Sequence, residues 1–488
     1  MALNKLLKDL ESLRSAVVEE ANGRYARWKS VIIPERDFVH QSVHNLANYL
    51  ALRHHDLRDL QRLLSPWGLS SLGRSEAQTL PTLDALIATV AQLVGNTEKT
   101  YPRPSAKDFQ SGEGLLFQET QRVLGAPHSE RTVRMMVTLP SEAAIDPLFV
   151  RHLMQHGMEI ARINCAHDGV KQWEAMVAHI RAAEESTGLC CKIAMDLGGP
   201  KCRTANVRLP KKHRIQRGDH LLLRTDMPKK DKHFPLQVRC TLPEAVEQIK
   251  LGDRVFFDDG IIGSTMIERV PQGVVLAVTQ AAIEGDRLKN DKGVNFPDTA
   301  LHFSPLTEKD LQDLPSIVQL ADILNYSFVQ SAEDVVLLQS EIEKVNTNQR
   351  SLAIIAKIET SQAFHQLPEI IVAIASKQPC GVMIARGDLA VELGFERMVE
   401  LQEEILWVCE AAHVPVIWAT QVLETLAKEG RATRAEMTDA AMSQRAEAVM
   451  LNKGAYILEA MDILDGVLRR MATHQHKKTA QLRPLLSF

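Results

Sequence analysis

From Val133 onward, short apolar runs alternate with helical patterns. Eight of these runs have the length of buried strands and end in polar residues: Thr138, Asn164, Asp196, Ser327, Glu359, Asp388, Gln421 and Asn452. Helical spacing lies between most of them, at residues 146–156, 170–186, 332–345, 398–412 and 434–445. Eight strand–helix units with polar strand ends predict an α/β fold, a (β/α)8 TIM barrel whose active site lies at one end.

One long segment between the third and fourth strands breaks this alternation. Residues 205–293 contain short β runs separated by glycine turns, with helical spacing only near residues 243–249. We expect a small inserted β-domain here, a β-barrel at the active-site rim that serves as a lid. The catalytic barrel then occupies residues 131–204 and 294–475, and residues 476–488 form a C-terminal tail.

Residues 1–130 have a different pattern of apolar and polar positions, which predicts a separate all-helical N-terminal domain. Leu6, Leu10, Leu13 and Val17 follow the three-to-four spacing of an amphipathic helix, and a second helix is expected around residues 43–57. Further helices are predicted at 56–64 and at 83–93, the latter behind a breaker segment at 79–82. Residues 97–114, with two prolines and several polar residues, are predicted to be a linker or surface loop.

Composition narrows the class of protein. A chain of 488 residues that is 45% hydrophobic can bury a large core, and its net charge of −4 argues against nucleic acid as the main partner. Seven cysteines, an odd number without C-x-x-C spacing, indicate reduced thiols and a cytoplasmic protein. Charges interrupt the apolar residues at the N-terminus, and no apolar run is long enough to span a bilayer, so we expect neither a signal peptide nor membrane association.

Two of the strand ends carry charges at informative positions. Lys357 and Glu359 are two residues apart, so they project from the same face of a strand at its C-terminal end. Charges at the end of a buried strand are costly to desolvate and call for a ligand, a metal or a partner. Gly387 and Asp388 end the next run, adding a second carboxylate and a glycine whose backbone a ligand can approach closely.

Eight short motifs occur in this half of the chain. They are A-R-I-N-C-A-H at 161–167, D-L-G-G-P-K-C-R at 196–203, D-D-G at 258–260, K-G-V-N-F-P at 292–297, A-K-I-E at 356–359, A-R-G-D-L at 385–389, W-A-T-Q-V-L-E at 418–424 and T-R-A-E at 433–436. In these motifs and in their order the chain resembles the pyruvate kinase family, over roughly Val133 to Met471. The resemblance implies phosphoryl transfer between phosphoenolpyruvate and ADP, giving pyruvate and ATP in glycolysis.

The resemblance also implies roles for matched residues around the substrate. Arg162 and Lys357 would hold the phosphoryl group, with Lys357 stabilising the transition state. The backbone amides of Gly387 and Asp388 would receive the substrate carboxylate at the start of a helix. Thr420 would contact the substrate and help relay a proton to the enolate carbon.

The cations and the nucleotide have implied ligands as well. Glu359 and Asp388 would bind Mg²⁺ or Mn²⁺. The positions matching the nucleotide side are Asn164, His167, Arg203 and Lys292, the last carried by the lid.

The chain departs from the family at the monovalent-cation site, which the resemblance places at Asn164, Asp196 and Leu197. Leu197 stands where the family has a threonine, and Lys201 stands where it has a glutamate. A lysine ammonium can supply the charge that K⁺ would bring, and in the family a lysine here accompanies independence of K⁺. We therefore expect that K⁺ is not required.

Other departures concern the rim loops and the C-terminus. Residues 138–141 and 452–455 differ from the family's nucleotide-facing loops, which leaves the preferred diphosphate acceptor open. Only 17 residues follow Met471, too few for the family's C-terminal effector domain, so we expect no activation by a sugar phosphate bound there. A homo-oligomer is expected, either a dimer or a tetramer.

Alternative functions remain at this stage. Buried Lys–Glu pairs can be structural, and a barrel aspartate can simply cap a helix. A Mg²⁺-dependent aldolase-like lyase would also present a glutamate and an aspartate, but the inserted lid and Lys357 suit nucleotide transfer better. A non-catalytic relative that senses phosphoenolpyruvate or binds a partner is the third interpretation, although it gives no reason to keep costly charges together.

Overall fold

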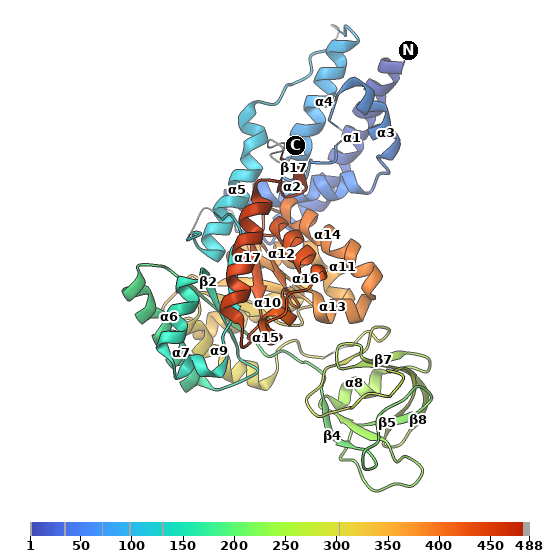
Figure 1. Ribbon diagram of the computed structural model, residues 1–488. Helices are drawn as coiled ribbons and strands as arrows, with labels where there is room; N and C mark the ends of the chain where they lie inside the picture. Colours follow the sequence, from blue (N-terminus) through green and yellow to red (C-terminus); the bar gives the residue numbers. More distant parts are fainter. Residues whose placement is uncertain are drawn as a thin grey trace.

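A closed barrel of eight parallel strands forms the middle of the molecule (Figure 1). The computed structural model describes residues 2–33, 36–70, 72–96, 99–128, 131–301 and 303–481. Around the barrel the strand order is β1-β15-β14-β13-β12-β11-β3-β2, and β2 pairs with β1 to close the ring. The predicted barrel is thus confirmed, with strands β1 (Arg134–Thr138), β2 (Met158–Asn164), β3 (Lys192–Asp196), β11 (Ile323–Tyr326), β12 (Ala353–Ile358), β13 (Cys380–Ala385), β14 (Val416–Ala419) and β15 (Ala448–Leu451).

Helices cover the outside of the barrel, as the alternating pattern predicts. Helices α9 and α10 each begin with a capping box, at Thr307 and Ser331 respectively. In a capping box the hydroxyl of the first residue accepts a hydrogen bond from the backbone N–H three residues later, and the carboxylate of that later residue accepts one from the backbone N–H of the first. The helical elements of this layer are α6 (Pro147–Gln155), α7 (Val170–Thr187), α9 (Glu308–Leu320), α10 (Ala332–Val345), α11 (Ser361–His365), α12 (Leu367–Lys377), α13 (Arg386–Leu393), α14 (Phe395–Ala411), α15 (Glu424–Glu429), α16 (Arg434–Met442) and α17 (Ile457–Ala472), with 3-10 turns η2 (Ser141–Ala144) and η3 (Ser443–Arg445).

The expected end of the sixth barrel strand is wrong. β13 ends at Ala385, and α13 begins at once with Arg386, so Asp388 lies in the first turn of a helix. The Arg386 guanidinium donates to the carbonyls of Ala419 (3.0 Å) and Thr420 (2.6 Å), which fixes the chain at this point. The apolar pattern runs on through the helix, and for that reason it did not mark the boundary.

The segment between β3 and β11 folds as a seven-stranded mixed sheet with its own apolar core. Backbone hydrogen bonds between residues 202–204 and 291–294 join the chain entering this sheet to the chain leaving it, so the sheet curls towards closure. Figure 1 shows this part, called the lid below, standing out beside the barrel. Its elements are β4 (Thr204–Arg208), β5 (His220–Arg224), β6 (Gln237–Cys240), α8 (Pro243–Gln248), β7 (Arg254–Phe257), β8 (Ile262–Val270), β9 (Gly273–Gln280) and β10 (Val294–Asn295).

The N-terminal part is helical, as predicted, but two details of the prediction are wrong. The supposed breaker segment 79–82 is the first turn of α4, where Pro81 is tolerated because the early N–H groups of a helix need no internal partner. Much of the supposed linker 97–114 belongs to α5, which begins with a capping box of Ser105 and Asp108. The elements are α1 (Ala2–Lys29), α2 (Asp37–Arg53), α3 (Arg58–Leu64), η1 (Ser65–Trp67), α4 (Thr79–Leu93) and α5 (Ala106–Leu124).

The end of α5 plugs the barrel. Val123 and Leu124 are fully buried in a cluster with interior side chains of the barrel strands. Val123 approaches Gly381 near the start of β13, and the Arg134 side chain donates to the carbonyl of Gly125. The plug therefore sits at the N-terminal ends of the strands, opposite the end where a barrel active site is built.

The N-terminal helices also bind the outside of the barrel through a few polar contacts. The imidazole of His413 donates from Nε2 to the Ala77 carbonyl (2.9 Å) and accepts at Nδ1 from the Ser42 hydroxyl (2.9 Å). Asn45 donates to the carbonyl of Ala411 at 2.9 Å. The C-terminal hairpin of β16 (Gln475–His476) and β17 (Thr479–Ala480) joins the same region, with Lys478 paired to Glu76.

Two further expectations concern compartment and membrane. All seven cysteines are free thiols, as expected. Within the described ranges, none of the helices has the length and apolarity needed to cross a bilayer.

Candidate active site

The C-terminal ends of β2, β3 and β12 bring four charged side chains together. Arg162 comes from β2, Asp196 is the last residue of β3, and Lys357 and Glu359 come from the end of β12. The parallel register places Asn164 beside Asp196, so these strand ends lie at the same level. The four residues are buried. We call them the rim cluster.

Arg162 and Asp196 form a two-pronged ion pair. Nε of Arg162 lies 3.1 Å from Oδ1 of Asp196, and Nη2 lies 2.7 Å from Oδ2. A third nitrogen, Nη1, donates to the Thr138 hydroxyl at 2.9 Å. Because a guanidinium has five N–H donors, two remain for a ligand.

Lys357 is held by three acceptors. Its Nζ lies 3.0 Å from Oε1 of Glu359, 3.3 Å from Oδ2 of Asp196 and 2.8 Å from the Ser327 hydroxyl. Burial alone would lower the pKa of Lys357, but the charges of Glu359 and Asp196 outweigh it and raise that pKa. Lys357 is therefore a fixed cation, and a phosphoryl oxygen would bind it by replacing one of the three acceptors.

Asp196 is the anionic centre of the rim cluster. Burial by itself would raise its pKa, but Arg162 and Lys357 together lower the pKa of Asp196 to about 2. The amide of Asn325 adds a 2.6 Å hydrogen bond to Oδ1. Asp196 thus stays charged and positions both cations.

Asp388 lies beside this cluster, in the first turn of α13, and is paired with Lys201. The Lys201 ammonium is 2.8 Å and 2.9 Å from the two carboxylate oxygens of Asp388. The same ammonium lies 5.8 Å from the centre of the Phe328 ring. Phe328 has a left-handed backbone, with φ of 55°, and its N–H donates to Oε2 of Glu359 at 2.6 Å.

Glu359 and Asp388 fit a divalent cation. Burial raises the pKa of Glu359, and the Asp388 charge adds to this rise although Lys357 opposes it. Two hard carboxylates that repel each other are suitable ligands for Mg²⁺ or Mn²⁺, which commonly keep water and substrate oxygens as further ligands. The described residues contain no group of three or more acidic, His or Cys side chains arranged for a metal. A bound cation would have to displace Lys201 from Asp388.

Thr420 is in a strained conformation next to α13. Its φ is 65°, in the left-handed region that a β-branched residue rarely adopts, at a typical free-energy cost of about 1–3 kcal/mol. Arg386 holds the Thr420 carbonyl at 2.6 Å, and the Thr420 hydroxyl accepts a hydrogen bond from the Gly387 N–H at 2.9 Å. The structure thereby brings Thr420 to the amides where the substrate carboxylate is expected.

Asn164 and His167 line a cavity of about 200 Å³ that Arg162 lines as well. Lys428 of α15 and Lys453, which follows β15, line it too. Oδ1 of Asn164 accepts the Ala166 N–H at 3.1 Å, which shapes the loop after β2. Asp168 and Glu424 line the cavity as well, so a polyanion would bind Arg162 and both lysines only if Lys428 left its ion pair with Glu424.

Arg203 and Lys292 do not line that cavity. Arg203 bonds to Asp291, 3.2 Å from its carbonyl and 3.4 Å from Oδ1. Lys292 pairs with Asp258 at 2.8 Å. The two expected nucleotide residues are therefore bound to acids of the lid segments, and they would reach a nucleotide only if these pairs exchange.

The residues expected for a monovalent cation have other partners. Asp196 is used by Arg162, Lys357 and Asn325, and Leu197 is buried with its N–H donating to the Asn325 carbonyl at 3.1 Å. Among the described residues, the ion pair of Lys201 is with Asp388. Lys201 thus places its charge at Asp388, one of the two carboxylates expected to bind the divalent cation.

Sequence reasoning missed several residues of the site. It assigned no role to Asn325, Ser327 or Phe328, which contact Asp196, Lys357 and Glu359, respectively. A signal was present, because the fourth strand run ends in N-Y-S-F, polar residues at the C-terminal end of a barrel strand. Lys428 has no such signal, since it lies on a helix well outside the strand ends.

The fold and the site together define a (β/α)8 barrel with an inserted lid and a cationic rim that holds two carboxylates. Residues 130–461 match the family described as "Pyruvate kinase, barrel domain". The chain belongs to the pyruvate kinase family.

Individual relatives agree with this assignment. The chain is 29% identical to pyruvate kinase PKLR of Rattus norvegicus over 404 residues, which cover 79% of this chain and 67% of that protein. It is 31% identical to a pyruvate kinase of Geobacillus stearothermophilus over 349 residues, 70% of this chain and 57% of that protein. A pyruvate kinase of Corynebacterium efficiens is 31% identical over 328 residues, 66% of this chain and 65% of that protein. The chain thus spans about 57–67% of the length of these relatives.

Proposed function

We propose that this protein transfers a phosphoryl group between phosphoenolpyruvate and ADP, forming pyruvate and ATP in glycolysis. The observation that supports the proposal is the rim cluster next to Asp388. There Arg162 and Lys357 are fixed within 2.7 Å and 3.3 Å of Asp196. Charge spreads over the oxygens of a transferring phosphoryl group, and preorganised cations stabilise that charge at little reorganisation cost.

Binding uses donors that the rim already offers. The two spare N–H groups of Arg162 and the Lys357 ammonium hold the phosphoryl oxygens. The substrate carboxylate lies at the first turn of α13, where the helix dipole and the N–H groups of Gly387 and Asp388 favour an anion. Thr420 can turn its hydroxyl from Gly387 towards the substrate and take part in the proton relay to the enolate carbon. ADP occupies the cavity of Asn164 and His167, the lid brings Lys292 to its phosphates, and Arg203 reaches them from the end of the barrel segment.

Glu359 and Asp388 would hold Mg²⁺ or Mn²⁺, which would supply a hard positive charge for the anionic substrate. Lys201 would have to leave Asp388 for this, and its ammonium would then add a positive charge to the site. Asp196 stays charged throughout and keeps Arg162 and Lys357 in place.

A coupled assay tests the proposed reaction. The purified protein is incubated with phosphoenolpyruvate, ADP and Mg²⁺, and pyruvate is followed with lactate dehydrogenase. We expect turnover that falls at least about a thousandfold in Lys357→Met, because the central cation is lost. Lys377→Met is the matched control, since Lys377 lies on outer helix α12 and pairs with Glu343.

Either of two results would contradict the proposed kinase activity. The first is the absence of turnover, and the second is a Lys357→Met protein as active as the wild type. Binding of phosphoenolpyruvate without turnover would favour the sensing function instead.

We also propose that the reaction does not depend on K⁺. Lys201 carries a positive charge into the site, 2.8 Å from Asp388. Activity in a potassium-free buffer with a tetramethylammonium salt should therefore equal activity with added KCl within about twofold. A large stimulation by KCl would contradict the proposal.

The proposal also includes the compartment and the oligomeric state of the enzyme. We propose a cytoplasmic enzyme that assembles as a dimer or tetramer of identical chains. Native mass spectrometry of the full chain distinguishes these assemblies from a monomer.

A further inference from the structure

One neutral amide side chain lies next to the charges of the rim cluster. Asn325 belongs to β11, and the parallel register places it directly beside Asp196 of β3. It is fully buried. The neighbouring interior positions are apolar, with Ile323 two residues earlier on β11 and Ile355 opposite on β12. A buried amide among such positions needs hydrogen-bond partners.

The Asn325 amide holds the Asp196 carboxylate. Its Nδ2 donates to Oδ1 at 2.6 Å, a shorter contact than those that Arg162 and Lys357 make with Asp196. The opposite orientation of the amide would bring two oxygens together, so the charge of Asp196 fixes which way Asn325 points. The backbone carbonyl of Asn325 also accepts the N–H of Leu197 at 3.1 Å. Asn325 therefore holds both the side chain of Asp196 and the backbone that follows it.

The same amide is a poor choice for stability alone. Among the described residues, no donor reaches Oδ1 of Asn325. A buried acceptor without a donor destabilises a fold, and an apolar side chain at this position would avoid that loss. The presence of the amide is explained if its bond to Asp196 serves the site.

The bond matters most when a substrate binds. Arg162 holds Asp196 with two nitrogens, so the two side chains form one unit, which the Thr138 hydroxyl contacts at the Arg162 end. Lys357 also contacts Asp196, but at 3.3 Å this is the longest of its three contacts and the first that a phosphoryl oxygen would replace. After that exchange, the Asn325 amide still ties Asp196 to the neighbouring strand.

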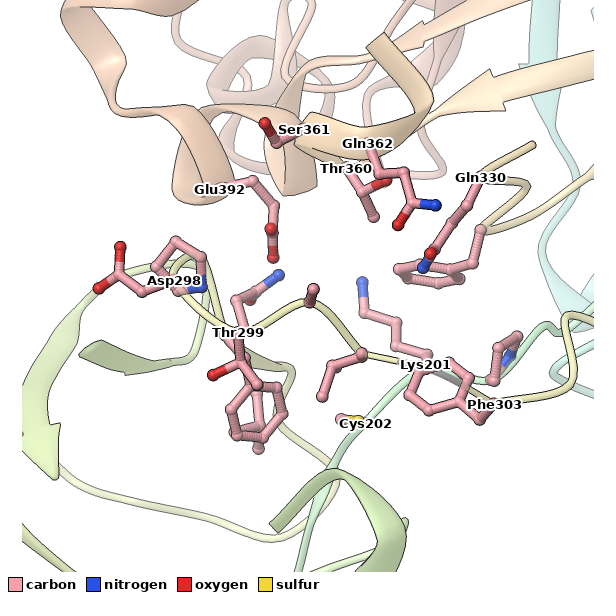
Figure 2. A pocket seen from close by; sticks show the side chains of 18 of the residues that line it. Lys201, Cys202, Asp298, Thr299, Phe303, Gln330, Thr360, Ser361, Gln362 and Glu392 are labelled. Atoms are coloured by element: carbon pink, nitrogen blue, oxygen red, sulfur yellow. The ribbon is translucent and has the colours of Figure 1, made fainter. Parts of the chain in front are cut away.

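Two cavities adjoin the site, and Asn325 lines neither of them. The smaller is the proposed nucleotide cavity. The larger, of about 310 Å³, is lined by Lys201 of the segment entering the lid and by Glu392 of α13, and Figure 2 shows it between the lid and the barrel. A ligand in either cavity does not contact Asn325, so this residue acts on a ligand through Asp196.

We propose that Asn325 is a positioning residue for the phosphoryl transfer: its amide fixes the Asp196 carboxylate, and with it the placement of Arg162 relative to Lys357, while the substrate is bound. The inference rests on the proposed function, because it concerns the same reaction. Without the amide, Arg162 and Lys357 keep their charges, so the substrate still binds. The charge that develops in the transition state is best stabilised by cations already in place, so the chemical step slows.

Steady-state kinetics of full-chain variants test this role. Asn325→Leu keeps the branched shape of the side chain but removes the donor. We expect kcat to fall roughly tenfold to a hundredfold, whereas KM for phosphoenolpyruvate changes by less than about threefold. Asn348→Leu is the matched control, because Asn348 lies in the exposed turn after α10, and it should leave both constants unaltered.

A double-mutant cycle tests whether Asn325 acts through Asp196. In an Asp196→Ala background there is no carboxylate to hold, so adding Asn325→Leu should lower kcat by less than about twofold. A loss as large as in the wild-type background would indicate a general effect on the barrel and would overturn the proposal.

Two other results would overturn the positioning role alone. They are wild-type turnover with an unchanged kcat in Asn325→Leu, and a rise in KM at constant kcat. A wild-type protein without turnover would overturn the proposed function and this role together.

Circular dichroism and urea unfolding establish whether the variants fold. If Asn325→Leu does not, Asn325→Ala takes its place, since it removes the donor without adding volume, and the same changes in kcat and KM are expected. Failure of both variants to fold would make Asn325 a structural residue and would also contradict the proposal.

Discussion

Lys201 lies where the proposed divalent cation would bind. Its ammonium holds both oxygens of Asp388, so a metal ion must compete with it. Lys201→Met should therefore bind Mn²⁺ more tightly in the absence of substrate, by roughly fivefold, the equivalent of a partly buried ion pair. Titration of free Mn²⁺ by electron paramagnetic resonance measures this change.

The matched control for that change is Lys309→Met, which removes an exposed lysine paired with Asp313 and should leave Mn²⁺ binding unaltered. Weaker Mn²⁺ binding in Lys201→Met would show that the lysine supports the metal instead of competing with it.

For single residues, the sequence predicted which side chains belong to the site better than it predicted which side chains they pair with. The i, i+2 spacing of Lys357 and Glu359 is a local signal, because side-chain alternation fixes their common face. The pairing of Arg162 with Asp196 and of Lys201 with Asp388 spans 34 and 187 residues, respectively. Such pairs depend on which strands become neighbours, and no local spacing contains that information.

The helix α5 packs closely against the polar junction of the N-terminal helices with the barrel. A Cβ atom at Gly112 would lie 2.1 Å from the Ala77 carbonyl oxygen and 2.9 Å from Nε2 of His413. Gly112→Ala should therefore destabilise the protein by about 2 kcal/mol, through overpacking and displaced hydrogen bonds. Urea unfolding monitored by circular dichroism measures the loss.

Gly114 on the same helix is the control. A Cβ atom there meets nothing within 4 Å, so Gly114→Ala should stabilise the helix by about 0.5–1 kcal/mol. Equal effects of the two substitutions would mean that the contact at Gly112 is not tight in solution.

Whether the ends of helices and strands were predicted correctly depended on which local sequence signal was stronger. The prolines and polar residues of 97–114 predicted a loop, yet Ser105 and Asp108 have the spacing of a capping box, and this box begins α5. At Asp388 the apolar pattern continued from strand into helix, so neither turn residues nor a change of texture marked the end of β13.

His413 joins two parts of the molecule that are distant in sequence. It is buried as a neutral imidazole, and burial lowers its pKa to about 4, although the bond to Ala77 opposes this. Between this value and the unfolded pKa of about 6.5, the unfolded chain binds a proton that the folded chain excludes. The stability that neutral His413 contributes is therefore complete above about pH 6.5 and is lost as the pH falls towards 4.

The difference in unfolding free energy between the wild type and His413→Asn isolates this effect. It should shrink by about 2 kcal/mol from pH 7 to pH 5. The comparison is needed because Glu392 and Glu410, whose pKa values burial raises to about 7, act in the opposite direction in both proteins. A difference that does not vary with pH would mean that His413 is not kept neutral.

The whole-molecule architecture was the most predictable level. Eight apolar runs with helices between them specify a closed barrel, and the loss of helical spacing after Asp196 revealed the lid. How the N-terminal helices meet the barrel was not predictable, because single polar contacts such as those of Asn45 and His413 decide it.

The plug at the base of the barrel has a consequence for biosynthesis. Leu124 leaves the ribosome long before its socket is complete, since the last strand of the barrel ends 327 residues later, at Leu451. At about 5–20 residues per second, this interval lasts roughly 15–65 s. Throughout it the nascent chain carries helices that can already pack locally, together with an apolar end that has no complete binding surface. Shielding by a chaperone during translation would protect the plug until β15 emerges.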